Sequence, residues 1–93
     1  MPRIRTHPGE ILQEEFLAPY GLSATELGRR IGVPANRLTE IIRGRRGVTA
    51  DTAIRLGHAF KTTPEFWTNA QTAYDLSKAL AEGDFSGVQV VAA

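Results

Sequence analysis

Polar side chains that can read base edges are gathered in one short segment of the chain. Residues 36–43 present Asn36, Arg37, Thr39, Glu40 and Arg43 between apolar positions. In the major groove an amide can bind adenine with two hydrogen bonds, a guanidinium can bind guanine, and a carboxylate can accept from the exocyclic amine of cytosine. Residues near the N-terminus of a groove-bound helix reach these edges. The segment therefore indicates sequence-specific DNA binding by Asn36, Arg37, Thr39 and Glu40.

A cluster of arginines surrounds this segment. Six of the eleven cationic residues lie between positions 29 and 46, and Glu40 is the one acidic residue among them, although the net charge of the whole chain is only +1. Arg43, Arg45 and Arg46 follow the segment, where they are expected to contact phosphates and to give salt-dependent affinity without reading sequence. An arginine cluster alone is also compatible with a solvated surface. The order of the neighbouring helix signals favours the DNA-binding interpretation.

Two short helices are expected to carry these side chains. Ser23 and Glu26 have the spacing of a capping box, which starts a helix at about Ala24. Gly32 ends that helix, because glycine readily adopts the positive φ of a sharp turn. A third helix follows from about Pro34 to Ile42, with proline in its first turn. The pattern predicts a helix-turn-helix unit over residues 23–43, with a small shared core formed by Leu27, Ile31, Val33, Leu38 and Ile41.

Three further helices complete an all-α domain that spans residues 1–93. The first begins at Pro8-Gly9 and is ended by Pro19 and Tyr20-Gly21. The fourth begins after Thr49 and has an inner face of Ala53, Ile54, Leu56, Gly57 and Phe60. The fifth covers about 63–82 and is capped by either Thr62 or Thr63, a choice that the residues leave open. The tail that contains Val88–Val91 is short and β-prone, and it could form a strand at a dimer interface.

The chain resembles the lambda-repressor-like (XRE) helix-turn-helix family and, more closely, the HigA and VapI antitoxins of type II toxin–antitoxin systems. The resemblance covers roughly residues 6–80. It is carried by five segments, namely His7-Pro8-Gly9-Glu10-Ile11-Leu12, residues 27–33, residues 43–49, Pro64-Glu65-Phe66-Trp67 and Ala73-Tyr74-Asp75-Leu76. The Pro-Glu-Phe-Trp segment is the most specific of these.

This resemblance implies a repressor of its own operon that also neutralises an mRNA-cleaving toxin of the HigB/RelE-like type. By analogy, Ala35, Asn36 and Glu40 occupy base-reading positions, whereas Ala24 and Arg43 occupy positions that contact the DNA backbone. We also expect Ser23 to contact the backbone. Pro34 stands where family members often have serine, so a hydroxyl cap is missing. The Ala35 methyl group could contact thymine but cannot hydrogen-bond. There are two alternatives: a stand-alone XRE-family regulator without a toxin partner, and a module whose main role is toxin capture.

A palindromic operator requires a homodimer, because its half-sites lie about one DNA turn, ~34 Å, apart. We expect the interface to use Trp67 and Tyr74 of the fifth helix together with Val88 and Val90. Phe66 is expected to anchor that helix to the core, whereas Trp67 could lie at the interface or be partly exposed.

The sequence gives no indication of an enzyme or of a cofactor. His7 and His58 are expected to have structural or surface roles, and the chain contains no cysteine, which excludes thiolate metal sites. No apolar run approaches the ~20 residues of a membrane helix. We expect a cytoplasmic protein.

Overall fold

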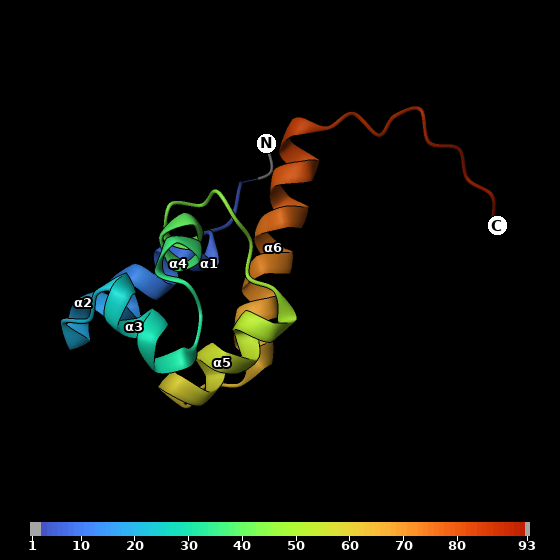
Figure 1. The fold of residues 1–93 in the computed structure, drawn as a ribbon. Coiled ribbons are helices and arrows are strands. Elements are labelled where there is room, and N and C mark those ends of the chain that lie inside the picture. Colours follow the sequence, from blue (N-terminus) through green and yellow to red (C-terminus); the bar gives the residue numbers. More distant parts are fainter. Residues whose placement is uncertain (1–2, 93) are drawn as a thin grey trace.

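The computed structural model describes residues 3–92, which are all helix, turn or loop (Figure 1). The elements in chain order are α1 (Pro8–Ile11), η1 (Leu12–Leu17), α2 (Ala18–Tyr20), α3 (Ala24–Ile31), α4 (Ala35–Ile42), α5 (Ala50–Phe60) and α6 (Pro64–Glu82). Because α1, η1 and α2 form one continuous helix, residues 3–92 contain five helices in all. The predicted all-α fold with five helices is confirmed.

The first helix has a widened turn in its middle. Its start is capped by His7, whose Nδ1 accepts from the Gly9 amide at 2.9 Å. The η1 segment has π-helical geometry, and the amide of Ala18 donates to the Gln13 carbonyl, five residues back. Proline lacks an amide hydrogen and normally breaks an α-helix. Here Pro19 follows the wide turn, and the helix ends as predicted, at Tyr20 before Gly21 with φ 64°.

The caps of α5 and α6 follow the sequence signals. The Thr49 hydroxyl accepts from the Thr52 amide at the start of α5. At the start of α6 the Thr63 hydroxyl accepts from the Phe66 amide, with Pro64 in the first turn. Thr62 has a different role, because its hydroxyl accepts from Trp67 Nε1 at 2.8 Å. The structure thus selects Thr63 as the cap.

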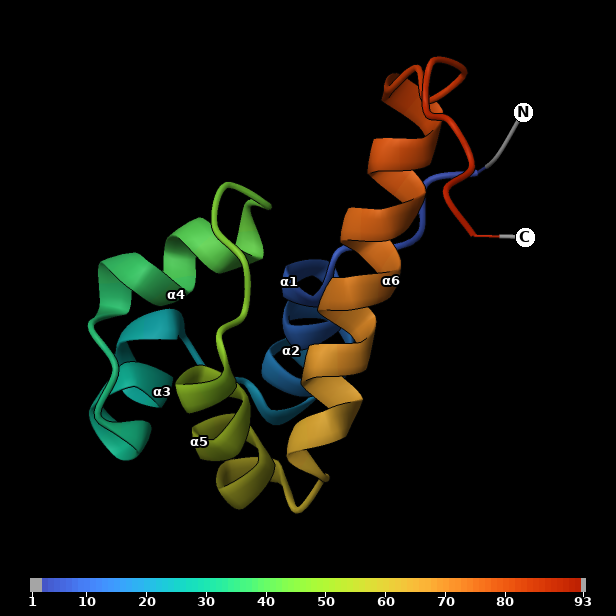
Figure 2. The same cartoon turned by 90° about the vertical axis from the view of Figure 1, so that its right-hand side faces the viewer.

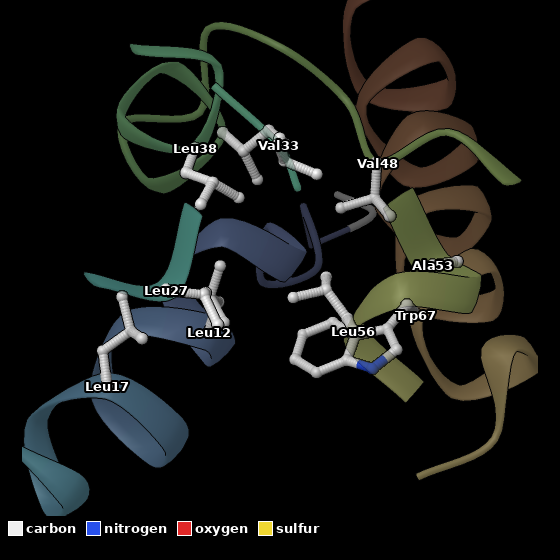
Figure 3. Packing of buried hydrophobic residues seen from close by; sticks show 10 residues of the cluster. Leu12, Leu17, Leu27, Val33, Leu38, Val48, Ala53, Leu56 and Trp67 are labelled. Carbon is white, nitrogen blue, oxygen red and sulfur yellow. The ribbon is translucent and has the colours of Figure 1, made fainter. Parts of the chain in front are cut away.

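The core lies where the first helix, α3, α4, α5 and the start of α6 meet (Figure 3). It contains ten buried hydrophobic residues, which are Leu12, Leu17, Leu27, Val33, Leu38, Ile41, Val48, Ala53, Leu56 and Trp67. Ile54, which was predicted to lie on the inner face of α5, is instead 47% exposed. It is two residues from Leu56 and therefore points about 160° away from the buried side of the helix, given 3.6 residues per turn.

Phe66 and Trp67 differ in their burial. Trp67 is fully buried, whereas Phe66 is 40% exposed. Neighbouring helical residues point about 100° apart, so only one of the two can face the middle of the core. Phe66 packs edge-on against Phe16, with 6.2 Å between ring centroids, but Trp67, which was expected at an interface or partly exposed, is the residue of α6 buried in the core.

The C-terminal tail leaves the end of α6 and extends away from the helices in Figure 1. Val88 and Val90 are 73% and 88% exposed. No residue of the described tail, up to position 92, is in a β-strand. The strand suggested for this tail would need a second copy of the chain as its partner. Within residues 3–92, no helix combines the length and the hydrophobicity needed to cross a bilayer.

Candidate nucleic-acid interface

Helices α3 and α4 form the predicted helix-turn-helix unit, on the side of the molecule away from α6 (Figure 2). The Ser23 hydroxyl caps α3 by accepting from the Glu26 amide at 3.1 Å. Gly32 ends α3 with φ 75°. Gly28 lets the chain after the turn come close, because a Cβ added at Gly28 would lie 2.5 Å from the Val33 carbonyl oxygen. Two glycines therefore set the sharp angle between the helices.

The second half of the predicted capping box is absent. The Glu26 carboxylate binds the guanidinium groups of Arg29 and Arg30 on the next turn of α3 instead of returning to the Ser23 amide. Hydrogen bonds from these two arginines hold the pKa of Glu26 below its usual value. Both arginines are consequently engaged with an acid of their own helix.

The first turn of α4 presents the predicted base-reading residues. Pro34 is the N-cap rather than a member of the first turn, and its side chain makes no capping hydrogen bond. Asn36 and Arg37 are exposed, and Ala35 is half-buried. The Thr39 hydroxyl donates to the Ala35 carbonyl at 3.0 Å, so its remaining lone pairs can only accept a bond. Because Leu38 and Ile41 are buried, the polar face of α4 points away from the core.

A Schellman turn closes α4. The Arg45 amide donates to the Glu40 carbonyl at 2.9 Å, and the Gly44 amide donates to the Ile41 carbonyl at 3.0 Å. Gly44 has φ 73°, a conformation that side chains rarely adopt. This closure places three arginines immediately beyond the C-terminal end of the helix.

The arginines near α4 differ in their partners. Arg46 forms an ion pair with Glu40, at 3.0 Å between Nη2 and Oε1. Among the described residues, Arg37, Arg43 and Arg45 form no ion pair with a carboxylate. These three exposed cations are the ones most available to a polyanion.

Two contacts that hold α3 and α4 in place could not be predicted from the sequence. Arg55 of α5 donates from Nη1 to the Ile31 carbonyl at 2.8 Å and also binds Asp51, which joins α5 to the end of α3. Gly9 lies against α4 so closely that an added Cβ would be 1.7 Å from the Ile41 carbonyl oxygen. The Arg55–Ile31 bond and the approach of Gly9 to Ile41 join residues at least 24 positions apart, so no local pattern could indicate them.

A helix-turn-helix family profile matches residues 13–67. The chain belongs to this helix-turn-helix family. The matched stretch begins at Gln13 in η1, includes α2, α3, α4 and α5, and ends at Trp67, the buried residue of α6.

Relatives of this helix-turn-helix protein include named antitoxins. Virulence-associated protein I of Dichelobacter nodosus is 48% identical over 91 residues, which is 98% of this chain and 81% of the relative. Antitoxin GraA in complex with its operator has a TM-score of 0.91 and 46% identity, over all of this chain and 97% of the other. Pseudomonas aeruginosa antitoxin HigA with the higBA promoter has a TM-score of 0.81 and 46% identity, over 85% of each chain. The predicted resemblance to HigA and VapI proteins is confirmed.

The residues predicted for a dimer interface are found in different settings. Trp67 has no exposed surface and so cannot contribute to an interface between intact domains. Tyr74 is half-buried and packs edge-on against His7, with 4.7 Å between ring centroids. Val88 and Val90 are exposed. Burial of Trp67 follows from the direction in which α6 packs, which its sequence alone leaves open.

The two histidines have different settings, and His58 is exposed on α5. His7 is a cap and a packing partner, and burial, the largest effect, lowers its pKa below 6.5. Among residues 3–92, no three histidine, aspartate or glutamate side chains converge as a metal ion would require.

Proposed function

We propose that this helix-turn-helix protein is an antitoxin that binds a palindromic operator as a homodimer and represses its own operon. In this proposal Asn36 and Arg37 enter the major groove with Ala35 and Thr39 beside them. Ser23 and Ala24 at the start of α3, and Arg43, Arg45 and Arg46 after α4, contact the DNA backbone. The toxin it neutralises would be an mRNA-cleaving enzyme of the HigB/RelE-like type, and both proteins would act in the cytoplasm.

The observation that carries this proposal is the exposed first turn of α4. Asn36 and Arg37 are the side chains there with the donors and acceptors needed for bidentate base contacts, and both are exposed. Arg43 and Arg45 lie just beyond the same helix without acidic partners in the described structure. The neighbours GraA and HigA, which carry the same fold, are described as complexes with an operator and a promoter.

A homodimer is proposed because one module buries only ~600–1,000 Å² on DNA, so two modules are the usual route to tight binding. The exposed side chains of Val88 and Val90 and the partly exposed Tyr74 would contribute to its interface. Sedimentation of a variant that lacks residues 88–93 tests the role of the tail, and an unchanged dimer would exclude it.

The test measures, by fluorescence anisotropy, binding to a duplex that covers the promoter of the chain's own gene. Asn36→Ala should remove base preference at one operator position per half-site, a loss of ~1–3 kcal/mol of discrimination. Arg45→Ala should weaken binding to all duplexes alike and lower the salt slope by about one. Lys78→Ala on α6 is the matched control for loss of one exposed cation. Parental affinity in both Asn36 and Arg45 variants would show that α4 is not the DNA-binding surface.

The antitoxin part is tested separately in cells. Co-expression with the toxin encoded next to this chain's gene should restore growth that the toxin alone arrests. Operator binding without this rescue would favour a stand-alone regulator.

A further inference from the structure

The Glu40–Arg46 ion pair links the middle of α4 to the loop that follows it. Nε of Arg46 donates to Oε1 of Glu40 at 3.1 Å, and Nη2 lies 3.0 Å from the same oxygen. The two side chains are 43% and 49% exposed, so the pair lies on the surface. The backbone supports it, because the Arg45 amide donates to the Glu40 carbonyl at 2.9 Å. Glu40 therefore holds both the loop and the guanidinium of Arg46.

This contact engages one edge of the guanidinium and leaves another available. An arginine side chain carries five N–H donors in a planar fork, one on Nε and two on each terminal nitrogen. Glu40 engages the edge formed by Nε and Nη2. The Nη1 donors take part in no hydrogen bond to Glu40 and can bind the oxygens of an anion.

The same contact makes Glu40 poorly suited to base reading. Its Oε1 already accepts from a cation, and charge-assisted bonds of this kind are stronger than bonds between neutral groups. Reading cytosine would require the carboxylate to turn from Arg46 toward a neutral amine and to lie close to the phosphates with its charge uncompensated. Asn36 and Arg37, one turn earlier, face no such competition in the described structure.

We propose that Glu40 is a positioning residue: it orients Arg46 so that Nη1 meets a DNA phosphate, and it does not read a base. This role rests on the proposed DNA-binding function of α4. The ion pair with Glu40 restricts the Arg46 side chain before DNA binds, so less conformational freedom is lost on binding. Freeing that side chain by Glu40→Ala should weaken binding to every operator sequence by about threefold to tenfold.

The first experiment separates positioning from base reading. Glu40→Ala and Glu40→Gln are compared with the parent on the promoter duplex and on all of its single-base-pair variants. The ranking of the duplexes should be unchanged in both variants. Glu40→Gln should lose less affinity than Glu40→Ala, because the amide oxygen of glutamine can still accept from Arg46. Loss of preference at one position in Glu40→Ala, or a new preference for adenine there in Glu40→Gln, would overturn the proposal.

The second experiment measures the coupling between the two side chains. Arg46→Ala should lower the salt slope by about one in the parent and by clearly less in the Glu40→Ala background. Arg43→Ala, which removes a cation without an acidic partner, should have the same effect in both backgrounds. Tighter binding by Glu40→Ala, or an Arg46→Ala effect of the same size in both backgrounds, would mean that Glu40 only repels phosphates.

The parent protein separates this proposal from the one on which it rests. If the parent does not distinguish the promoter from a scrambled duplex, the proposed function fails, and the positioning role fails with it. If the parent does distinguish them and the Glu40 variants behave otherwise than stated, only the positioning role is refuted. Circular dichroism of each variant verifies that the helices are retained.

Discussion

The substitution Gly28→Ala tests the idea that close approach of the backbone sets the angle of the helix-turn-helix unit. A Cβ at this position would lie 2.5 Å from the Val33 carbonyl oxygen and 3.4 Å from the Ala35 nitrogen. Ordinary carbon–oxygen contacts begin at ~3.3 Å, so the backbone after the turn would have to move by roughly 0.8 Å. Since both neighbours are backbone atoms, no side-chain rotation can relieve the contact.

The expected magnitude follows from two opposing effects. In an open helix, replacing glycine by alanine stabilises by up to ~1 kcal/mol. Overpacking of a tight site destabilises by typically ~1–3 kcal/mol. Here we expect overpacking to dominate, with a net loss of at least ~1 kcal/mol, which corresponds to a fall of about 4–8 °C in the melting temperature of a domain of this size.

Thermal unfolding followed by circular dichroism measures this change, and promoter binding shows whether the displaced α4 still reaches DNA. Gly87→Ala is the matched control, because an added Cβ there meets no atom within 4 Å. Its melting temperature should equal that of the parent. If Gly28→Ala melts at or above the parental temperature, close approach at Gly28 does not determine the geometry of the turn.

Two further predictions concern α6 and the N-terminal cap. Trp67→Ala should destabilise the fold by ~3–5 kcal/mol, whereas Phe66→Ala should cost less than ~2 kcal/mol, because Trp67 is fully buried and Phe66 is partly exposed. Urea unfolding measures both losses of stability, and equal losses would contradict the assigned packing. Burial lowers the pKa of His7 below 6.5, so the folded state binds this proton more weakly than the unfolded state. Stability should therefore fall as the pH drops from about 6.5 to the folded pKa and should be level above that window. His7→Asn, which can still cap the Gly9 amide, should lose this part of the pH dependence of the melting temperature, and a variant that keeps it would exclude His7 as the titrating group.

Helix boundaries and the functional unit could be predicted from the sequence because their signals are local. Ser23 and Thr49 cap helices through hydroxyls that reach amides three residues ahead, and Gly32 ends a helix through its own backbone freedom. Such interactions need no information about the rest of the chain. The spacing of apolar residues likewise placed Leu27, Leu38 and Ile41 in the core, where the structure has them. The exposure of Asn36 and Arg37 follows from the same spacing.

Other features depended on which surfaces meet when the helices pack. Phe66 and Trp67 are adjacent and both aromatic, so only the packing of α6 against η1 and α5 decides that Trp67 is buried. Arg46 and Glu40 are six residues apart across a turn, and Arg55 reaches the end of α3 from a different helix. A sequence defines the faces of each helix through its 3.6-residue period, but the rotation of one helix against another comes from the fit of side chains contributed by distant segments.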